Sequence, residues 1–199
     1  MKTQLIISIK IFALLTLLCG VIYPLFITGI AQVIFPKKAN GSLIFQDNKV
    51  IGSELIGQKF DSIIYFSSRP SATDYNPLPS GGSNLGPTSS KLRQMVDDRS
   101  AQFTRFNQVP GSEAIPSEML YASASGLDPH ISPKAALLQV DRIIKARNFS
   151  DEQKQKLVKF IADQTESPQF TILGEARINV LVLNLALDKL ENQSLNNKN

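Results

Sequence analysis

The stretch that decides the fold is Ile11–Phe35, which reads IFALLTLLCGVIYPLFITGIAQVIF. It contains no charged side chain, and lysines stand on both sides of it, Lys2 and Lys10 before it and Lys37 and Lys38 after it. A helix rises about 1.5 Å per residue, so about 20 apolar residues cross the roughly 30 Å hydrocarbon core of a bilayer. The sequence therefore predicts one membrane-spanning helix at residues 11–35.

A cleaved secretory signal is the alternative interpretation of the same stretch. The lysines before it are typical of a signal, and Gly29-Ile30-Ala31 would serve as a small-x-small cleavage site. The apolar core of a signal is usually about 7–15 residues long, however, and this stretch is longer. Because Lys37 and Lys38 also follow it as a stop-transfer flank, we favour a retained anchor.

Four positions in the stretch are candidates for contact with a partner in the membrane: Gly20, Tyr23, Pro24 and Gly29. A proline in a spanning helix is tolerated when a neighbouring helix satisfies the carbonyl that loses its donor. Small residues let two helices approach each other closely. The alternative is that these residues reflect the ordinary composition of a membrane helix.

The net charge of the chain belongs to the flanks of this stretch. It is +4, from 21 Lys and Arg against 17 Asp and Glu, and four of the lysines are the flanking ones. The other 17 basic residues balance the 17 acidic ones, so the rest of the chain is neutral. Nucleic-acid binding needs a clustered basic surface, so no nucleic-acid partner is expected. The single cysteine, Cys19, lies within the stretch and leaves none for a disulfide outside it.

The residues after the stretch predict an α+β fold, with a single mixed α/β extramembrane domain at residues 39–191. A short N-terminal flank at residues 1–10 precedes the membrane helix, and a polar tail at residues 192–199 ends the chain. A domain of about 150 residues is large enough to bury a core of its own.

Strand signals occur near both ends of this predicted domain. Apolar residues on both sides of 46–49 predict a short hairpin, and Ile63–Phe66 is a β-prone run. Residues 67–90 carry too many prolines and glycines for a continuous helix or strand. Alternation in Arg177–Asp188 predicts a strand in its first half, with a helix as the alternative for Asn184–Leu190.

Helix signals dominate the middle of the domain. Apolar residues recur at helical spacing over 92–106, after a serine N-cap. A capping hydroxyl followed by proline, Ser132-Pro133, starts a second helix, and the capping box of Ser150 and Gln153 starts a third. The buried stripe expected in the second helix is Ala136, Leu137, Val140, Ile143 and Ile144.

The loop Ser80–Gly86 is a candidate phosphate cradle. Its glycines expose backbone N–H groups that can face an anion. The lysine that a Walker loop requires is missing, and a tight structural loop is the alternative. The nucleotide-binding candidates are Ser80, Gly81, Gly82, Ser83 and Asn84.

The only histidine, His130, lies near Asp128, Ser125 and Ser132 in the sequence, which suggests a Ser-His-Asp triad. These residues share one proline-interrupted loop without the G-x-S-x-G elbow, and turn and cap chemistry explains them better. One histidine without cysteines cannot build an ordinary zinc site. We therefore expect no catalytic residue and no metal site.

Arg69 is a further candidate for contact with a partner. Its guanidinium lies in an irregular loop, where it can bind a carboxylate or the carbonyls of another protein. The alternative is an internal salt bridge to a loop aspartate such as Asp74.

Four stretches resemble a known family. They read YFSSRPSA at 65–72, SGGSNLGP at 80–87, SASGLDPHISP at 123–133 and RINVLVLNLALD at 177–188. Together with the N-terminal anchor, they closely resemble the C subunit of the bacterial Kdp-type potassium-transporting ATPase. Ala124 and Ala176 depart from the glycine and proline that this family often has there.

The resemblance implies a non-catalytic subunit of a high-affinity, ATP-driven potassium import complex in the bacterial inner membrane. Its partners there would be a P-type ATPase subunit that hydrolyses ATP, a potassium-channel-like subunit and a small single-helix subunit. The resemblance also implies a catalytic chaperone that raises the affinity of the ATPase subunit for ATP. No cofactor is expected to bind tightly, and ATP could bind in a composite site with the ATPase subunit.

Two properties of the resembling family conflict: the effect on ATP affinity and the location of the large domain. The domain is seen outside the cytoplasm, where it cannot contact cytoplasmic ATP. The flanking lysines are nearly symmetric, so the positive-inside rule does not decide the topology. The missing Walker lysine favours an assembly role, with an internal N-terminus and a periplasmic domain. The alternative is a direct nucleotide-binding helper that uses Ser80–Gly86.

Overall fold

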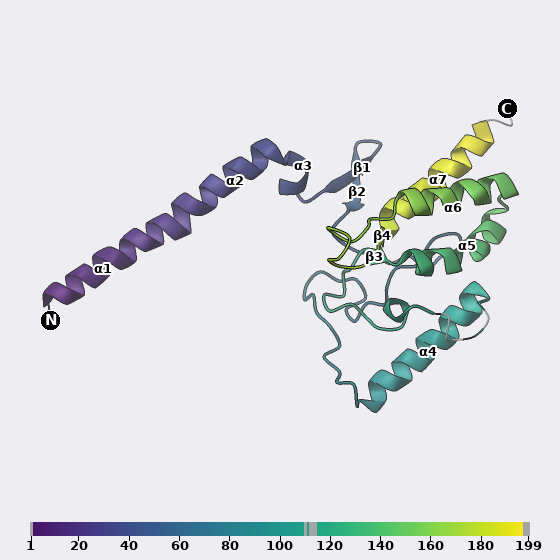
Figure 1. Ribbon diagram of the computed structural model, residues 1–199, viewed down its shortest axis with the longest axis horizontal. Helices are drawn as coiled ribbons and strands as arrows, with labels where there is room; N and C mark the ends of the chain where they lie inside the picture. Colours follow the sequence, from purple (N-terminus) through teal and green to yellow (C-terminus); the bar gives the residue numbers. More distant parts are fainter. Residues whose placement is uncertain (1, 110, 112–114, 197–199) are drawn as a thin grey trace. The chain divides into compact units, whose positions relative to one another are not determined.

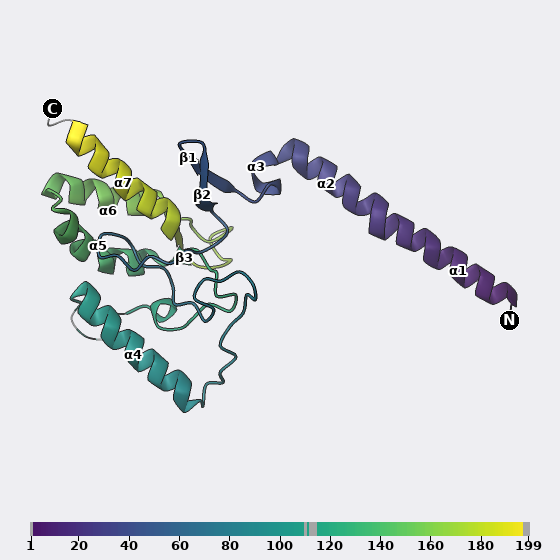
Figure 2. The same ribbon diagram turned by 180° about the vertical axis from the view of Figure 1, so that it is seen from behind.

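The computed structural model describes residues 2–109, 111 and 115–196. Its contacts divide the chain into two compact units, Met1–Ser53 and Glu54–Asn199. The first unit contains a long helix and a hairpin, and the second contains helices with short strands (Figures 1 and 2). This mixture of an N-terminal apolar helix and an α/β region confirms the predicted fold class. The residue boundaries predicted for the domain and its tail stay a prediction.

The N-terminal helix runs without interruption from α1, Lys2–Leu17, through α2, Tyr23–Ile34. Among the described residues it is the one helix long and apolar enough to cross a membrane. None of its residues counts as buried within the protein. Its 33 residues correspond to about 50 Å of helix, more than the hydrocarbon core of a bilayer requires.

A single π-helical turn, Leu18–Ile22, joins α1 to α2 immediately before Pro24. There the N–H of Tyr23 donates to the carbonyl of Leu18, five residues earlier, whereas in an α-helix the acceptor lies four residues earlier. Proline has no N–H, and its ring crowds the carbonyl four residues earlier. The wider turn lets the helix continue through Pro24.

A short helix and a hairpin complete the first unit: α3, Pro36–Ala39, β1, Leu43–Gln46, and β2, Lys49–Ser53. The strands are antiparallel, which confirms the predicted hairpin. Its two turn residues, Asp47 and Asn48, have φ of 49° and 60°. A two-residue turn of this hand matches the twist of the paired strands, and both residue types tolerate positive φ.

Three helices of the second unit begin at the caps that the sequence predicts. The hydroxyl of Ser89 accepts from Leu92 N at the start of α4, Ser90–Asn107. Ser132 caps α5, Pro133–Arg147, and the capping box of Ser150 opens α6, Asp151–Asp163. The remaining elements are the 3₁₀ turn Ser117–Met119, β3, His130–Ile131, β4, Ile178–Asn179, and α7, Val180–Asn196.

The core of the second unit lies between these helices. α5 contacts both α4 and α6, and α6 contacts α7 (Figure 1). Leu137, predicted for the buried stripe of α5, is exposed instead. The largest fully buried apolar side chains are Phe66, Ile131, Ile143, Leu157, Ile161, Ile178, Val180, Leu183 and Leu187.

The β-prone run Ile63–Phe66 is not a strand, so that prediction is wrong. Five consecutive carbonyls, those of residues 63–67, accept hydrogen bonds from side chains of α5 and α7. Arginine and amide side chains thus bind this segment in place of a neighbouring strand. Residues 63–65 form a turn and a bend instead of an extended strand, and Phe66 is buried whereas Ile63 is exposed.

The strand predicted for the first half of Arg177–Asp188 is mostly wrong: Arg177 forms an isolated bridge with Glu166, and Ile178–Asn179 forms a two-residue strand paired with β3. From Val180 onward the chain is helical, and α7 continues to Asn196, into the stretch predicted as a polar tail. The buried residues Val180, Leu183 and Leu187 follow a helical period. The stretch is so uniformly apolar that it also satisfies the alternating pattern.

Candidate functional site

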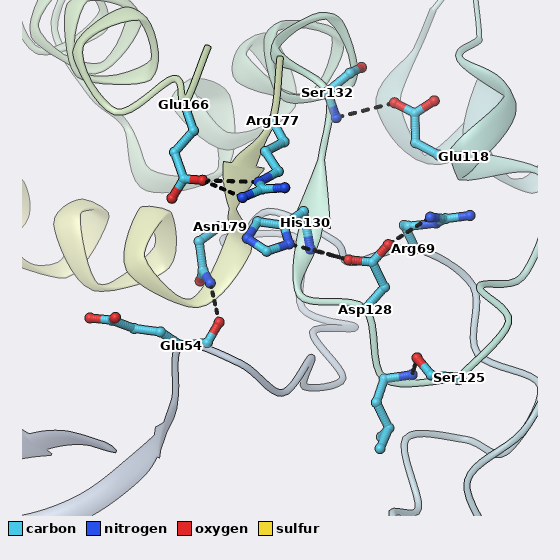
Figure 3. Close-up of polar contacts among 11 residues, drawn as sticks. Glu54, Arg69, Glu118, Ser125, Asp128, His130, Ser132, Glu166, Arg177 and Asn179 are labelled. Carbon is cyan, nitrogen blue, oxygen red and sulfur yellow. Dashed lines mark hydrogen bonds and ion pairs between the residues drawn. The ribbon is translucent and has the colours of Figure 1, made fainter. Parts of the chain in front are cut away.

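A polar pocket of about 520 Å³ lies in the second unit beside β3 (Figure 3). It collects charged side chains from four segments that are distant in the sequence. Among its lining residues are Arg69, Glu118, Asp128, His130 and Arg177. The pocket therefore contains the histidine and the loop arginine that the sequence suggested as candidates.

Asp128 is the centre of the hydrogen bonds in this pocket. Figure 3 shows Arg69 and His130 meeting its carboxylate from opposite sides. Arg69 Nη1 lies 2.7 Å from Oδ2, and the backbone N–H of His130 donates to Oδ1 at 3.0 Å. Burial alone would raise the pKa of Asp128, but the hydrogen bonds from His130 and Arg69 outweigh it and lower this pKa to about 2. Asp128 is thus a fixed anion at neutral pH.

Arg69 forms an internal salt bridge, but with Asp128 and not with Asp74. Asp74 pairs instead with Lys59, 2.8 Å away. The Nε of Arg69 is buried and has no acceptor within hydrogen-bond distance among the described residues. Contact of Arg69 with a partner protein stays a prediction.

The hydroxyls near His130 act in a turn and a helix cap, as expected. Ser125 Oγ accepts from Leu127 N at 3.1 Å, and Ser132 Oγ accepts from Ala135 N at 3.1 Å. Glu118 accepts from the backbone N–H of Ser132 at 3.2 Å (Figure 3). This pocket is therefore built from ion pairs and capping bonds that hold loops together.

The candidate nucleotide loop is joined to the loop that carries Ser125. Gly81 N–H donates to the Ser125 carbonyl at 3.0 Å. A Cβ on Gly82 would lie 3.2 Å from the Ala124 carbonyl oxygen, so the two backbones approach closely there. One N–H of the candidate cradle is thus engaged within the protein. Nucleotide binding by Ser80, Gly81, Gly82, Ser83 and Asn84 stays a prediction.

Gly126 shows how tightly these two loops fit together. Its φ of +71° favours glycine, and a Cβ there would lie 2.5 Å from Thr73 Oγ1 and 3.1 Å from the Gly81 carbonyl. Ser71 Oγ also donates to the Gly126 carbonyl at 2.7 Å. The three sequence stretches at 65–72, 80–87 and 123–133 therefore meet in one interlocked loop structure.

The four candidate positions in the membrane helix, Gly20, Tyr23, Pro24 and Gly29, lie exposed along it. Around Gly29 the missing side chain leaves a shallow groove of about 390 Å³. A Cβ on Gly29 would meet nothing within 4 Å, so the groove is open to an incoming side chain. Its lining is apolar: Leu25, Phe26, Ile30, Val33 and Ile34.

Sequence reasoning did not single out the buried polar side chains that hold residues 63–67. Gln139, Arg142, Arg147 and Asn184 are all nearly inaccessible to solvent. Their helical spacing could have predicted this burial, because Gln139 and Arg142 fall on the same side of α5 as its apolar stripe. These residues position a structural segment, and no reacting group lies among them.

An exposed apolar turn was also missed. Phe170 and Ile172 are 84% and 80% exposed, the turn residues Phe170 and Thr171 have positive φ, and Gln169 and Leu173 exchange backbone hydrogen bonds of 2.9 Å beneath them. Two backbone hydrogen bonds therefore support a turn that exposes large apolar side chains to solvent. Such exposed apolar groups are typical of protein interaction sites.

Comparison with known proteins gives a consistent result along nearly the whole chain. A family model described as "K+-transporting ATPase, c chain" matches residues 5–189. The potassium-transporting ATPase KdpC subunit of Geobacter metallireducens is 47% identical over 187 residues, which cover 92% of this chain and 96% of that protein. The KdpC subunits of Polaromonas naphthalenivorans and Geobacter sulfurreducens are 48% and 49% identical, covering 96% and 92% of this chain and 97% and 96% of theirs.

Proposed function

The chain belongs to the family of the K+-transporting ATPase c chain, and from this premise we propose that it holds a potassium-transporting complex together at the membrane. It is an accessory subunit in potassium transport. The proposal adds that its own contacts stabilise the complex, while a P-type ATPase subunit hydrolyses ATP and a potassium-channel-like subunit admits the ion. A small single-helix subunit completes the proposed set of partners.

The observation that carries this proposal is the helix Lys2–Ile34. Its residues from Ile11 onward are uncharged and mostly apolar, none of them is buried, and the groove at Gly29 offers a place for the side chain of another helix. Close packing at small residues is a main source of helix association inside a bilayer. The exposed Phe170 and Ile172 add a second apolar surface in the other unit that a partner subunit can cover.

The proposed effect on ATP is indirect. We infer that the second unit lies outside the cytoplasm, so that it raises the ATP affinity of the ATPase subunit only through the arrangement of the complex. The engaged N–H of Gly81 supports this choice over a direct cradle at Ser80–Gly86. A direct nucleotide-binding helper, or a composite ATP site shared with the ATPase subunit, remains the alternative.

We expect that replacing residues 11–35 by a leucine-rich helix of equal length, with the flanking lysines kept, weakens association with the complex. Close van der Waals packing at small residues contributes to helix association in a bilayer, and the leucine-rich helix would not reproduce it. A loss of about 1.4 kcal/mol would correspond to a tenfold weaker association. The measurement is recovery of this subunit with the affinity-tagged transporter, together with growth at limiting potassium.

Single substitutions in the helix provide the matched control. Gly29→Leu fills the groove and should reproduce the weaker association, whereas Ala31→Leu adds the same side chain outside the groove lining and should not. Full recovery and normal growth with both the swapped helix and Gly29→Leu would show that the helix is only a tether.

Topology decides between the indirect and direct effects on ATP. In a Cys19→Ala background, the only thiol can be placed at the exposed surface of α6 with Gln155→Cys. We expect a membrane-impermeant maleimide to label this cysteine in intact spheroplasts, and a Thr3→Cys control only after lysis. The opposite pattern would place the second unit in the cytoplasm and favour the nucleotide-binding alternative.

A further inference from the structure

The hairpin of the first unit presents an apolar face to its surroundings. Phe45 and Val50 are paired across the strands, and they are 61% and 55% exposed. Residues paired in this way share one face. The register shifts by one residue of β2 between Ile44 and Phe45, but β1 has no inserted residue, so Leu43, two residues before Phe45, lies on this face too. Leu43 is itself 39% exposed, so three large apolar side chains share an uncovered face.

This hairpin is attached closely to the end of the membrane helix. The side-chain amides of Gln32 and Asn40 exchange two hydrogen bonds, of 3.1 and 3.3 Å, across the turn between α2 and α3. The N–H of Ser42 donates to the Lys37 carbonyl at 2.9 Å, which folds the chain back just before β1. The hairpin therefore begins within about one helical turn of α3 and does not hang from a flexible linker.

A further hydrogen bond closes the base of the hairpin. Ser53 Oγ, at the end of β2, donates to the Gly41 carbonyl at 2.6 Å. Only seven residues separate Phe35 from Leu43, and part of them is helical. Even a fully extended segment of that length reaches only about 25 Å, so Leu43 cannot move far from the end of the apolar stretch.

The charges around the apolar face fit one surface. Residues 36–53 contain three lysines, Lys37, Lys38 and Lys49, and one acidic residue, Asp47, for a net charge of +2. The rest of the chain outside the membrane helix carries no such excess of positive charge. Apolar side chains beside lysines are typical of segments that lie in the headgroup region of anionic membranes.

We propose that the β1–β2 hairpin is a second membrane contact, with Leu43, Phe45 and Val50 inserted at the boundary between headgroups and acyl chains. Lys49 and the lysines of α3 contact anionic phosphates beside it. The hairpin and the Gln32–Asn40 bonds then fix the angle at which the chain leaves the bilayer. This inference rests on the proposed membrane crossing of α1 and α2.

The chain contains no tryptophan, so one substitution provides a unique fluorescent reporter. The full-length Phe45→Trp variant is reconstituted in vesicles of phosphatidylcholine and phosphatidylglycerol, with and without bromine on the acyl chains near the headgroup. We expect its emission to shift to the blue, to be quenched by the brominated lipid and to be shielded from aqueous iodide. Val50→Trp, its cross-strand partner, should behave in the same way and guards against a single variant that misfolds.

Phe35→Trp, at the end of the apolar helix, tests the proposed membrane crossing separately from the proposed hairpin contact. Quenching of Phe35→Trp together with Phe45→Trp supports the proposal. If Phe35→Trp is quenched while Phe45→Trp and Val50→Trp emit as in water, the hairpin faces a partner subunit or solvent, and the proposal is overturned although the membrane crossing stands. If Phe35→Trp is not quenched, the crossing itself fails, and the inference fails with it.

Discussion

Replacing Arg142 by leucine is expected to lower the free energy of unfolding of the second unit by about 3–5 kcal/mol. The guanidinium donates to Asn107 Oδ1 at 2.8 Å, to the Tyr65 carbonyl at 2.9 Å and to the Ile63 carbonyl. Leucine would leave the buried Asn107 Oδ1 and the two partly buried carbonyls without this donor. Each buried acceptor left in this way costs about 1–3 kcal/mol.

The cost of burying this cation is offset by its neighbours. Burial lowers the pKa of Arg142 to about 10, so the side chain is still charged at neutral pH. Its partners are carbonyl and amide oxygens, and its guanidinium carbon lies 4.4 Å from the centre of the Phe106 ring. The buried charge of Arg142 is therefore stabilised only while α4, α5 and residues 63–65 keep this arrangement.

Urea unfolding of the full chain in detergent, followed by far-ultraviolet circular dichroism, measures this effect. Arg105→Leu is the matched control, because Arg105 is an exposed arginine on α4, and it should change stability by less than about 0.5 kcal/mol. Arg142→Lys should also be destabilising, since an ammonium cannot reach the planar set of acceptors. A change below about 1 kcal/mol for Arg142→Leu would contradict the assigned role.

Replacing Asn184 by leucine has the second large expected effect, a decrease of about 2–4 kcal/mol in the free energy of unfolding. The Asn184 amide accepts from Phe66 N–H at 2.8 Å and donates to the Phe66 carbonyl at 3.0 Å. Leucine has the same branched arrangement of four side-chain heavy atoms and is larger, so it leaves no cavity, but it satisfies neither of these two buried groups. The decrease should therefore come from unpaired backbone groups and not from a cavity.

Hydrogen exchange at single residues tests this directly. The Phe66 amide should exchange much faster in Asn184→Leu, while the Ser67 amide, bound 2.7 Å from Gln139 Oε1, keeps its protection. Asn184→Asp retains an acceptor for Phe66 N–H but turns a carboxylate oxygen toward the Phe66 carbonyl, so this buried charge should also be destabilising relative to the wild type. Unchanged exchange at Phe66 in Asn184→Leu would refute the pairing.

Local signals predicted the helices and the hairpin because their causes are local. The hydroxyls of Ser132 and Ser150 satisfy N–H groups three residues away, and Asp47 and Asn48 set the turn between β1 and β2. The long apolar helix was predictable because its length and the absence of charge over residues 11–35 define it.

Predictions failed where a segment depends on distant partners. Residues 63–66 are β-prone in sequence, but they form an irregular turn whose carbonyls accept hydrogen bonds from side chains of α5 and α7. The stretch from Ile178 is apolar on nearly every side, so its period could not be assigned from sequence.

The candidate site shows the same limit. The internal ion pair of Arg69 was foreseen as an alternative, but its partner was wrong, because Asp74 was chosen for its closeness in sequence and Asp128 lies 59 residues away. Gln139 and Arg142 were missed because a polar residue on a helix is exposed unless a distant segment covers it. Phe170 was missed because a single exposed phenylalanine leaves no sequence pattern.

The π-turn at Leu18–Ile22 changes how a neighbouring helix meets this one. One additional residue in a turn rotates all that follows by about 100° relative to a regular helix. A face that runs along α1 therefore does not continue in line along α2. Two different neighbouring helices can therefore each pack against one segment of this helix, and Pro24 lies where the two segments meet. If the helix crosses the membrane as proposed, one crossing can in this way form two separately oriented helix contacts.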